Sequence, residues 1–470
     1  MSKTPSEELR THYLPFNLLL LWAFCHGSAW AHANAGIDSI DVVPTTNGDR
    51  PGIETTVGYI KPLSTSSFEW LCHETVTQTG ALITPQYTEN SAGIVLATVG
   101  DPGQAKDPNE TVYRSADGCE WSPPSGLSGQ RVIALEFDPN NDSRALAATA
   151  NPNGENRIFR SIDSGETWSS TDLSVDGKTF RSLRFASGLD GVVWASSVRH
   201  ETEEAWVYRS LDGGMSWSEH AVEVRPAGGL NVYVDVLVAD SRNPETAWVV
   251  MGPFLDDQLL RTADGGLSFE SVYEPDGDII DGTQDREGGI WLITTGNKTI
   301  HSADGDSFRR VDTAPLSLGV GADAVTGQVH LATRVMSENH ALSTSIDGST
   351  FESVDIFGSL LGPPECPADT DSYIQCNPLW PELAATLYGS LDTGSPSDTG
   401  TSPTEIPRDK DGHQGCQCSH APSPNPALLM FVIGWMGWQR TRKRTPLGRP
   451  YAPALPMQQI HNKKRPTGSP

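Results

Sequence analysis

The sequence predicts an all-β fold built from repeated short hairpins, and two observations support this prediction. The chain of 470 residues contains 45 glycines and 34 prolines, and so many turn formers favour short strands over long helices. A pattern of Ser or Thr, then Asp, Gly and an aromatic residue occurs six times, with first residues 46, 49, 52, 40 and 43 positions apart. Periods of this length indicate repeated supersecondary units.

Residues 1–31 are typical of a secretory signal peptide. Two basic residues precede the short apolar run 14–24, and small residues allow cleavage after Ala31. The run is too short for a good membrane span. Cys25 follows Phe24 rather than the small residue that lipidation needs, so we expect export without a lipid at Cys25. An exported protein reaches an oxidising compartment, in which disulfides form.

Each copy of the repeated pattern predicts a strand–turn–strand hairpin. β-like runs such as TVYRS and RIFRS precede most copies, and short strands such as FESVY follow several of them. The Asp carboxylate can accept hydrogen bonds from backbone N–H groups of the turn, and Gly supplies its positive φ. The aromatic side chain covers the turn with apolar surface. The predicted structural pairs are Asp117 and Trp121, Asp163 and Trp168, Asp212 and Trp217, Asp264 and Phe269, Asp304 and Phe308, and Asp347 and Phe351.

These hairpins resemble Asp-box repeats, also called BNR repeats, whose pattern is S-x-D-x-G-x-T/S-W. In that family the repeats lie between the outer two strands of β-propeller blades, so the resemblance, which covers residues 37–360, implies a propeller. The copies that begin at Ser115, Ser302 and Ser345 are one residue shorter than the others. The last three copies end in Phe rather than Trp, and we expect them to form the same turn.

The resemblance and the period together predict the number of blades. One repeat length before Trp121 lies Ser66–Trp70 (SSFEW), which resembles a copy that has lost its Asp. We therefore expect a propeller of seven blades over residues 37–362, each of four antiparallel strands, with six blades as the alternative. The segments 137–142 (FDPNND) and 239–250 (ADSRNPETAWVV) also resemble each other, and we expect them to form the same inter-strand loop in two blades.

Six cysteines remain after cleavage of the signal peptide. Cys366 and Cys376 bracket a short polar loop in a Pro-rich appendage of residues 363–383, and we expect them to pair. Cys72 and Cys119 are the expected second pair. A zinc site would need Cys or His at tight spacing in two halves, which the sequence lacks.

A linker and a sorting segment are predicted to follow the appendage. Residues 384–415 are rich in Ser, Thr, Gly, Pro and Asp and have too little apolar content to fold. Residues 416–444 contain Cys416 and Cys418, a short apolar run and an arginine cluster, which the positive-inside rule places in the cytoplasm. This order resembles MYXO-CTERM, a surface-sorting tag of myxobacteria and their relatives. The resemblance implies cleavage near the cysteines and retention at the cell surface through a modified Cys. The alternative is an ordinary weak membrane anchor, and such tags usually lack a basic tail like 445–470.

The charge of the chain excludes one class of partner. Residues 32–439 carry 57 acidic and 23 basic side chains, a net charge of −34, which repels phosphate backbones, so we expect no nucleic-acid partner. No Gly-rich loop follows a strand and opens a helix, so no nucleotide site is expected. The acidic loop 274–287 offers oxygen ligands for calcium, but Ile280 stands at a ligand position of the EF-hand pattern, which favours a solvated loop. We expect neither a metal nor a cofactor.

Bacterial sialidases also carry Asp boxes, so a sialidase-like activity has to be weighed. Membership of that family would imply an Arg-Ile-Pro motif near the first blade, two further arginines, a Tyr–Glu nucleophile pair and an acid/base Asp. Arg-Ile-Pro is absent there, the nearest match being Asp-Arg-Pro at 49–51, and the Arg-Pro at 225–226 falls in the wrong blade. Four arginines each precede a copy of the repeat, so the repeat places them, and we expect them to pair with acids on neighbouring strands. They are Arg114, Arg160, Arg209 and Arg261.

The sequence therefore predicts an exported propeller that the C-terminal segment holds at the cell surface or outer membrane. We expect it to bind a glycan or a protein without catalysis, through the propeller face at which loops of several blades meet around the central channel. Machinery that processes the C-terminal segment is the other expected partner. The alternatives are a divergent sialidase-like glycoside hydrolase and an envelope assembly or scaffold propeller.

Overall fold

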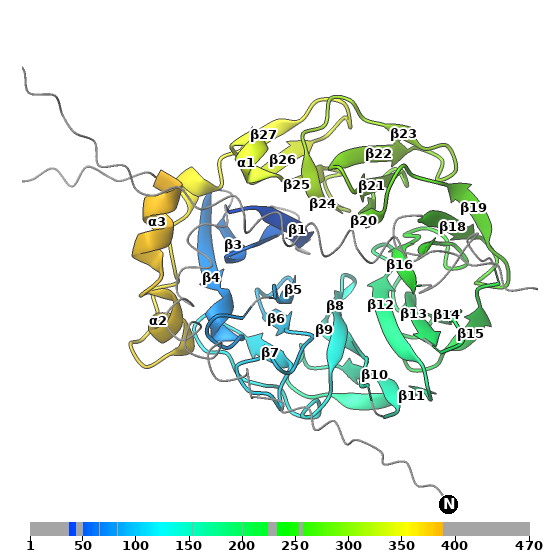
Figure 1. Cartoon of the computed structure of the whole chain (residues 1–470), viewed down its shortest axis with the longest axis horizontal. Helices are drawn as coiled ribbons and strands as arrows, with labels where there is room; N and C mark the ends of the chain where they lie inside the picture. Colours follow the sequence, from blue (N-terminus) through cyan, green and yellow to red (C-terminus); the bar gives the residue numbers. More distant parts are fainter. Residues whose placement is uncertain are drawn as a thin grey trace, which may run out of the picture. The chain divides into compact units, whose positions relative to one another are not determined.

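The computed structural model describes residues 37–388 apart from 44–49, 65, 82, 153, 200, 224–232 and 253–256. These residues form seven antiparallel sheets, arranged as blades around a central channel (Figure 1). The predicted seven-bladed β-propeller is confirmed, and the six-bladed alternative is wrong.

Several predictions concern residues outside this part of the chain. They are the signal peptide with its cleavage at Ala31, the linker beyond Tyr388, the sorting segment with Cys416 and Cys418, and the basic tail. Within the described part, no helix is both long enough and apolar enough to cross a membrane.

The strands of each blade pair in chain order, so the first is innermost and the fourth outermost. Blade 1 contains β1 (Ser39–Val43), β2 (Gly52–Thr55), β3 (Gly58–Ser64) and β4 (Ser67–Cys72), followed by the short helix η1 (His73–Thr75). Blade 2 contains β5 (Gln86–Glu89), β6 (Val95–Thr98) and β7 (Val112–Ser115), and Ser122 completes it through a bridge to Arg114. Blade 3 contains β8 (Val132–Asp138), β9 (Asn141–Thr149), β10 (Asn156–Ser161) and β11 (Ser169–Val175).

The remaining four blades repeat this plan. Blade 4 contains β12 (Thr179–Phe185), β13 (Val193–Arg199), β14 (Glu204–Ser210) and β15 (Ser218–Ala221). Blade 5 contains β16 (Tyr233–Ala239), β17 (Ala247–Gly252), β18 (Gln258–Thr262) and β19 (Glu270–Tyr273). Blade 6 contains β20 (Ile279–Gln284), β21 (Ile290–Thr294), β22 (Lys298–Ser302) and β23 (Arg309–Arg310). Blade 7 contains β24 (Ser317–Ala322), β25 (Val329–Thr333), β26 (Leu342–Ser345) and β27 (Glu352–Val354), with helix α1 (Val335–Glu338) before β26.

The hydrophobic core lies between neighbouring blades. The second strands β17 and β21 are buried at every position, because the adjacent blades cover both of their faces, and they read as continuous apolar runs. The outermost strands β15 and β19 contain no buried residue. One core cluster joins blades 4 and 5 through side chains such as Trp194 and Val249.

Each copy of the repeat forms the turn between the third and fourth strands of its blade, and we call these six turns the box turns. Their glycines also contact the preceding blade. A Cβ atom built on Gly165 would lie 2.6 Å from Cδ2 of Leu96, and one on Gly305 would lie 2.4 Å from the Trp248 ring. A residue larger than Gly would therefore push neighbouring blades apart as well as strain the positive φ. The same contact joins Gly214 to Leu146 and Gly348 to Trp291.

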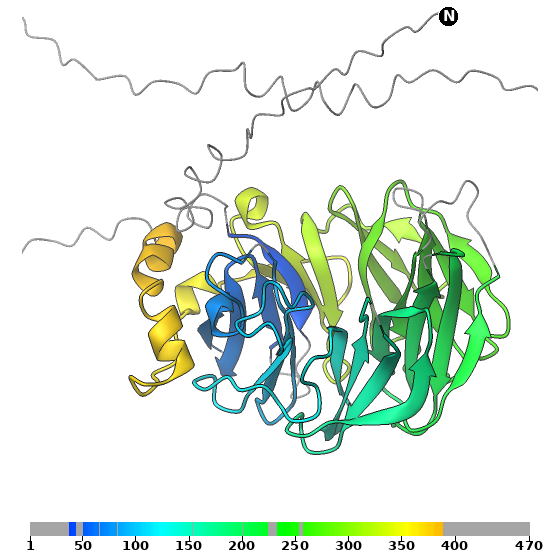
Figure 2. The same ribbon diagram turned by 60° about the horizontal axis from the view of Figure 1, so that its bottom comes forward.

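Within the described strands β1 pairs only with β2, so no strand of one blade completes the sheet of the other where the ring closes. Instead, the chain that leaves blade 7 runs along the outer edge of blade 1. Leu360 forms a parallel bridge with Phe68, and the Trp70 N–H donates to the Gly362 carbonyl at 2.8 Å. Residues 357–388, which we call the clasp, contain η2 (Phe357–Ser359), α2 (Asp371–Cys376) and α3 (Trp380–Tyr388). The two α-helices of the clasp lie outside β4 (Figures 1 and 2).

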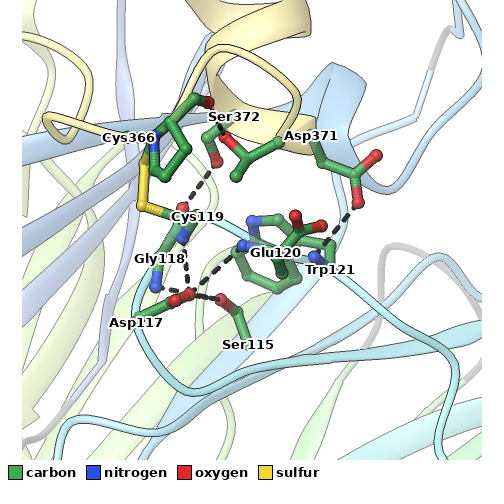
Figure 3. The surroundings of a disulfide bond; sticks show 11 residues. Ser115, Asp117, Gly118, Cys119, Glu120, Trp121, Cys366, Asp371 and Ser372 are labelled. Carbon is green, nitrogen blue, oxygen red and sulfur yellow. Dashed lines mark hydrogen bonds between the residues drawn. A yellow bond between two sulfur atoms is a disulfide. The ribbon is translucent and has the colours of Figure 1, made fainter.

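Two disulfides fasten the clasp, and both differ from the predicted pairs. Cys376 bonds to Cys72 at the end of β4, and Cys366 bonds to Cys119 in the first box turn. The prediction paired cysteines that are near in sequence, whereas the fold brings together cysteines 304 and 247 residues apart. Figure 3 shows that Ser372 of α2 supports the second bond, since its N–H donates to the Cys119 carbonyl at 3.0 Å.

The appendage is also longer than predicted. Helix α3 continues through residues 384–388, which the sequence analysis assigned to the linker. Leu387 packs on the core cluster of blades 1 and 7, and the Tyr388 hydroxyl donates to the Phe357 carbonyl at 2.9 Å. These contacts give the last turn of the helix a tertiary role that its composition does not reveal.

Candidate functional site

A cavity of about 1100 Å³ occupies the central channel at the end where the first strands begin. We call it the channel cavity. Neighbouring strands of a blade are antiparallel, so the third strand runs in the same direction as the first. The box turns follow the third strands and therefore lie at the other end of the blades. Stabilising turns and candidate binding site occupy opposite faces of the propeller.

The cations of the channel cavity come from blades 3 and 4. Arg131 directly precedes β8, Lys178 directly precedes β12, and Arg181 and Arg184 lie on β12. The Arg181 guanidinium reaches Asp235 of blade 5 at 3.1 Å. Lys178 lies over the Trp206 ring, 3.8 Å from its centre, and pairs with Glu219 at 2.6 Å.

The carboxyls of the channel cavity come mainly from blades 5, 6 and 1. Asp235 lies on β16, Asp281 on β20, Asp41 on β1 and Glu54 on β2. Glu201, in the loop between β13 and β14, is the one lining acid from blade 4. The cavity is therefore dipolar, with a cationic wall on blades 3 and 4 and an anionic wall on the other side of the ring.

Acids on the first strands, both inside the cavity and beside it, also stabilise the seams between blades. A first strand has no partner on its channel side, so its N–H groups there need other acceptors. Oδ2 of Asp281 accepts from the Val320 N–H of blade 7 at 2.6 Å. Glu136 of β8 likewise accepts from the Phe185 N–H of blade 4 at 3.3 Å. Acidic side chains in the channel are thus explained in part by the fold itself.

Asp41 and Asp281 come from blades 1 and 6, yet both lie against β24 of blade 7 and line the same cavity. Blade 7 permits this approach because Gly319 of β24 has no side chain, and a Cβ there would lie 2.7 Å from Cα of Asp41. Asp41 also stands opposite Glu54 across the strand pair. Burial raises the pKa of Asp281 and Glu54 well above its usual value, and the Asp41 charge raises both further. The group therefore retains protons at pH values where exposed carboxyls have lost them.

Arg184 is the countercharge of this carboxyl group. Burial alone would lower its pKa, but Glu136, Asp281 and Asp41 raise it above the usual arginine value. Arg184 in turn lowers the pKa of Glu136, although burial outweighs this effect and leaves that pKa at about 7. Because several buried carboxyls lie close together here, the folded chain needs a cation beside them for stability.

Glu136 makes the stability of the protein depend on pH. Its pKa is raised from 4.5 to about 7, so its contribution to stability is full below pH 4.5 and is lost as the pH rises through 7. We expect Glu136→Gln to raise the melting temperature at pH 8 and to leave it nearly unchanged at pH 4.5. Thermal unfolding at both pH values checks this, with the exposed Glu352→Gln as control. Equal shifts at the two pH values would contradict the assignment.

The box turns have the predicted hydrogen bonds. Asp212 accepts from the N–H groups of Met215 and Ser216 at 3.0 and 2.9 Å. The indole N–H of Trp217 donates to the Gly214 carbonyl at 3.0 Å. Despite partial burial, the hydroxyl and backbone donors of Ser216 hold the pKa of Asp212 below its usual value. The same acceptor role recurs at Asp117, Asp163, Asp264, Asp304 and Asp347.

We expect Asp212→Ala to lower the free energy of unfolding by ~1 kcal/mol, as does the loss of a capping carboxylate elsewhere. Ligand binding should be unchanged, because the turn lies on the face opposite the channel cavity. Chemical denaturation and a binding assay on the same preparation test both parts. Loss of binding at unchanged stability would show that the turn is itself a binding site.

The four arginines that precede the box turns connect successive blades. Arg261 pairs with Glu270 on the neighbouring strand β19 at 3.6 Å, as predicted, and also with Asp306 of the next box turn at 3.1 Å. Arg209 pairs instead with Glu245 in the loop between β16 and β17 of blade 5. Arg114 and Arg160 differ from the prediction, since each donates to a backbone carbonyl of the next box turn, at 3.0 and 2.9 Å. None of the four lines the channel cavity.

The acidic segment 274–287 is not the solvated loop that was expected, because Ile279–Gln284 form β20 and Asp281 lines the channel cavity. Asp285 accepts from the Gly289 N–H at 2.7 Å and from the indole of Trp291 at 2.8 Å, and it faces His301. In the described residues no group of three or more His, Cys, Asp or Glu is placed to hold a metal ion.

The sialidase pattern is present only as a set of residue types. The channel cavity contains Tyr87 and Glu54 beside its three arginines and Asp41. However, the Tyr87 hydroxyl contacts Nδ1 of His73 at 3.1 Å, and its ring stacks on Tyr59 at 5.0 Å. Glu54 accepts the backbone N–H of Tyr87 rather than its hydroxyl. A nucleophilic phenol paired with that carboxylate is therefore not formed.

The residues of the channel cavity do not stand out in the sequence. Asp41, Arg181 and Asp281 stand at β-bulges, which shift the alternation of side chains along the strand. No repeat or motif marks these positions, and the charges converge only when the ring closes. The one available signal is the pair of arginines within the otherwise strand-like segment TFRSLRF (179–185).

No family model matches the chain, and no curated protein matches it. Similar solved structures include the GH74 xyloglucanase of Xanthomonas campestris, with 16% identity and a TM-score of 0.38 over 56% of this chain and 43% of that one. An ancestral GH74 enzyme is 14% identical, with a TM-score of 0.41 over 63% of this chain and 39% of that one. YCF48 bound to D1 peptide is 17% identical, with a TM-score of 0.34 over 57% of this chain and 78% of that one. The chain thus spans less than half the length of the two GH74 enzymes. These neighbours are β-propellers, and at such identities the likeness concerns architecture alone.

Proposed function

We propose that the protein is an exported, surface-anchored propeller that binds a glycan or protein ligand in the channel cavity without catalysis. The observation that carries this proposal is the cavity itself, a hollow of about 1100 Å³ lined by charged groups from several blades. Concave pockets are the usual ligand sites of proteins, and the polar groups that line them orient the ligand. The two disulfides fit export, because such bonds persist in oxidising compartments.

Surface anchoring is proposed from the C-terminal sequence, with its two cysteines, apolar run and arginine cluster. Mass spectrometry of the mature protein tests it. Cleavage near Cys416 with a modified Cys supports sorting by the tag, and a mature chain that ends at Pro470 would rule it out.

A sialidase-like hydrolase is the second candidate, and one observation favours it. Arg131, Arg181 and Arg184 line a single cavity, where they could grip a carboxylate. The engagement of Tyr87 with His73 argues against the nucleophile that such an enzyme needs. Envelope assembly remains a third candidate that no observed contact favours.

Two assays on the purified full chain separate these candidates. A glycan array, together with capture from envelope extracts, should give binding that Arg131→Gln and Arg181→Gln weaken. Fluorogenic sialosides should show no turnover above that of buffer. Turnover that disappears in Arg181→Gln would establish the hydrolase instead and refute the non-catalytic proposal.

A further inference from the structure

The chemistry of the channel cavity narrows the class of ligand, on the premise that this cavity is the binding site proposed above. Its volume of about 1100 Å³ exceeds the range of roughly 300–1,000 Å³ that is common for drug-sized molecules. Lining groups come from the first strands of all seven blades and from the loop between β9 and β10. A short chain segment fits such a space better than a single small molecule does.

The charge in the cavity departs from that of the protein as a whole. Whereas residues 32–439 carry a net charge of −34, four cations and five carboxyls among the described residues line the cavity. The cations gather on blades 3 and 4, and four of the five carboxyls lie on blades 5, 6 and 1. An extended ligand that enters the channel therefore meets opposite charges on its two sides.

The cationic wall has capacity for an anionic group. Arg131 directs its Nε–H to the Gly100 carbonyl at 2.8 Å, and it has no carboxylate partner among the described residues. Arg181 is 40% exposed at its side chain and shares Asp235 across the seam to blade 5. A ligand carboxylate between Arg131 and Arg181 would gain two charge-assisted hydrogen-bond donors.

The anionic wall has capacity for a cationic group. Asp41 and Asp281 line the same cavity, and burial raises the pKa of both, so the pair retains a proton more readily than exposed carboxyls do. An ammonium or guanidinium group can replace that proton and pair with both carboxylates. A neutral sugar would instead remove water from charges on both walls without supplying a countercharge, which is costly.

We propose that the channel cavity binds a zwitterionic peptide segment, with its acidic group at Arg131 and Arg181 and its basic side chain at Asp41 and Asp281. The ligand class is thus a protein with an acidic and a basic residue close together, and not a neutral glycan. Such binding weakens with added salt, because part of it is Coulombic.

The test uses the full chain and an array of acetylated, amidated octapeptides in which one Glu and one Lys take every spacing. Arrays with Glu alone, Lys alone and no charge, together with cellohexaose, complete the probes. We expect binding at particular Glu–Lys spacings, at least tenfold tighter than to any singly charged or neutral probe. Arg131→Gln and Arg181→Gln should each weaken it at least tenfold. The matched control Arg310→Gln removes an exposed cation from β23, outside the cavity, and should change nothing.

The possible failures are distinguishable. Tight binding of cellohexaose that both arginine variants leave intact, or binding of peptides regardless of charge, would overturn the zwitterion proposal while keeping a ligand-binding propeller. Absence of binding to every peptide class would overturn it as well. Binding that Arg181→Gln leaves unchanged but Asp212→Ala abolishes would place the site on the opposite face and overturn the channel cavity as the site.

Discussion

The double variant Cys72→Ala/Cys376→Ala is expected to lose about 4 kcal/mol of unfolding free energy. This disulfide links positions 304 residues apart, and so long a closed loop strongly restricts the unfolded chain. It also fastens the clasp to blade 1, where no shared strand joins the first and last blades. Both cysteines are fully buried, and the Cys72 N–H donates to Sγ of Cys376 at 3.3 Å, so the variant also removes this acceptor. Denaturant unfolding of the wild type and the variant measures the loss of unfolding free energy, with the Cys119–Cys366 disulfide intact in both proteins.

The blades in which hydrogen exchange increases show whether the disulfide closes the ring or stabilises the whole propeller equally. Hydrogen exchange should increase first in β1–β4 and in the clasp helices, and least in blades 4 and 5, which lie away from the ends of the ring. Cys119→Ala/Cys366→Ala is the matched control, since it cuts the other bond of the same clasp and should open blade 2 as well. Unchanged exchange in β1–β4 would contradict the role of the clasp as the closure of the ring.

Arg184→Met is expected to lower the free energy of unfolding by ~3 kcal/mol at pH 8, because it leaves partly buried carboxylates without their cation. Met has a similar volume and no charge, so the effect is electrostatic rather than one of packing. The loss should shrink at pH 5, where Asp41, Glu136 and Asp281 hold protons more readily in the folded state.

Unfolding in denaturant at the two pH values tests this dependence, with Arg310→Met as an exposed control. The same loss at pH 5 and pH 8 would show that Arg184 acts through packing. No loss at either pH would show that the carboxyl group of the channel needs no countercharge.

The sequence sufficed for the architecture because the repeat is local. A turn such as Ser210–Trp217 is specified by residues within one hairpin, and its recurrence predicted the blades. Ser66–Trp70, predicted as a copy that has lost its Asp, is not a box turn, because Ser67–Trp70 lie within β4, the outer strand of blade 1. The matching segments 137–142 and 239–250 both connect the first and second strands of their blades.

The candidate site depends on contacts that no local pattern encodes. Asp41 and Asp281 come to line one cavity only because the ring closes and Gly319 leaves room beside Asp41. The disulfides were mispaired for the same reason, since nearness in sequence is a poor guide when the last helices pack on the first blade. The fold thus follows from residues that are close together in the sequence, whereas the candidate site depends on residues that are far apart in it.

The most direct test of binding in the channel cavity compares the two faces of the propeller in one measurement. Peptide and glycan arrays are probed with the full-length wild type, with Arg181→Gln on the cavity face and with Asp212→Ala on the box-turn face. We predict that every probe bound by wild type loses signal with Arg181→Gln and keeps it with Asp212→Ala. Signal kept with Arg181→Gln and lost with the folded Asp212→Ala variant would contradict binding in the channel cavity.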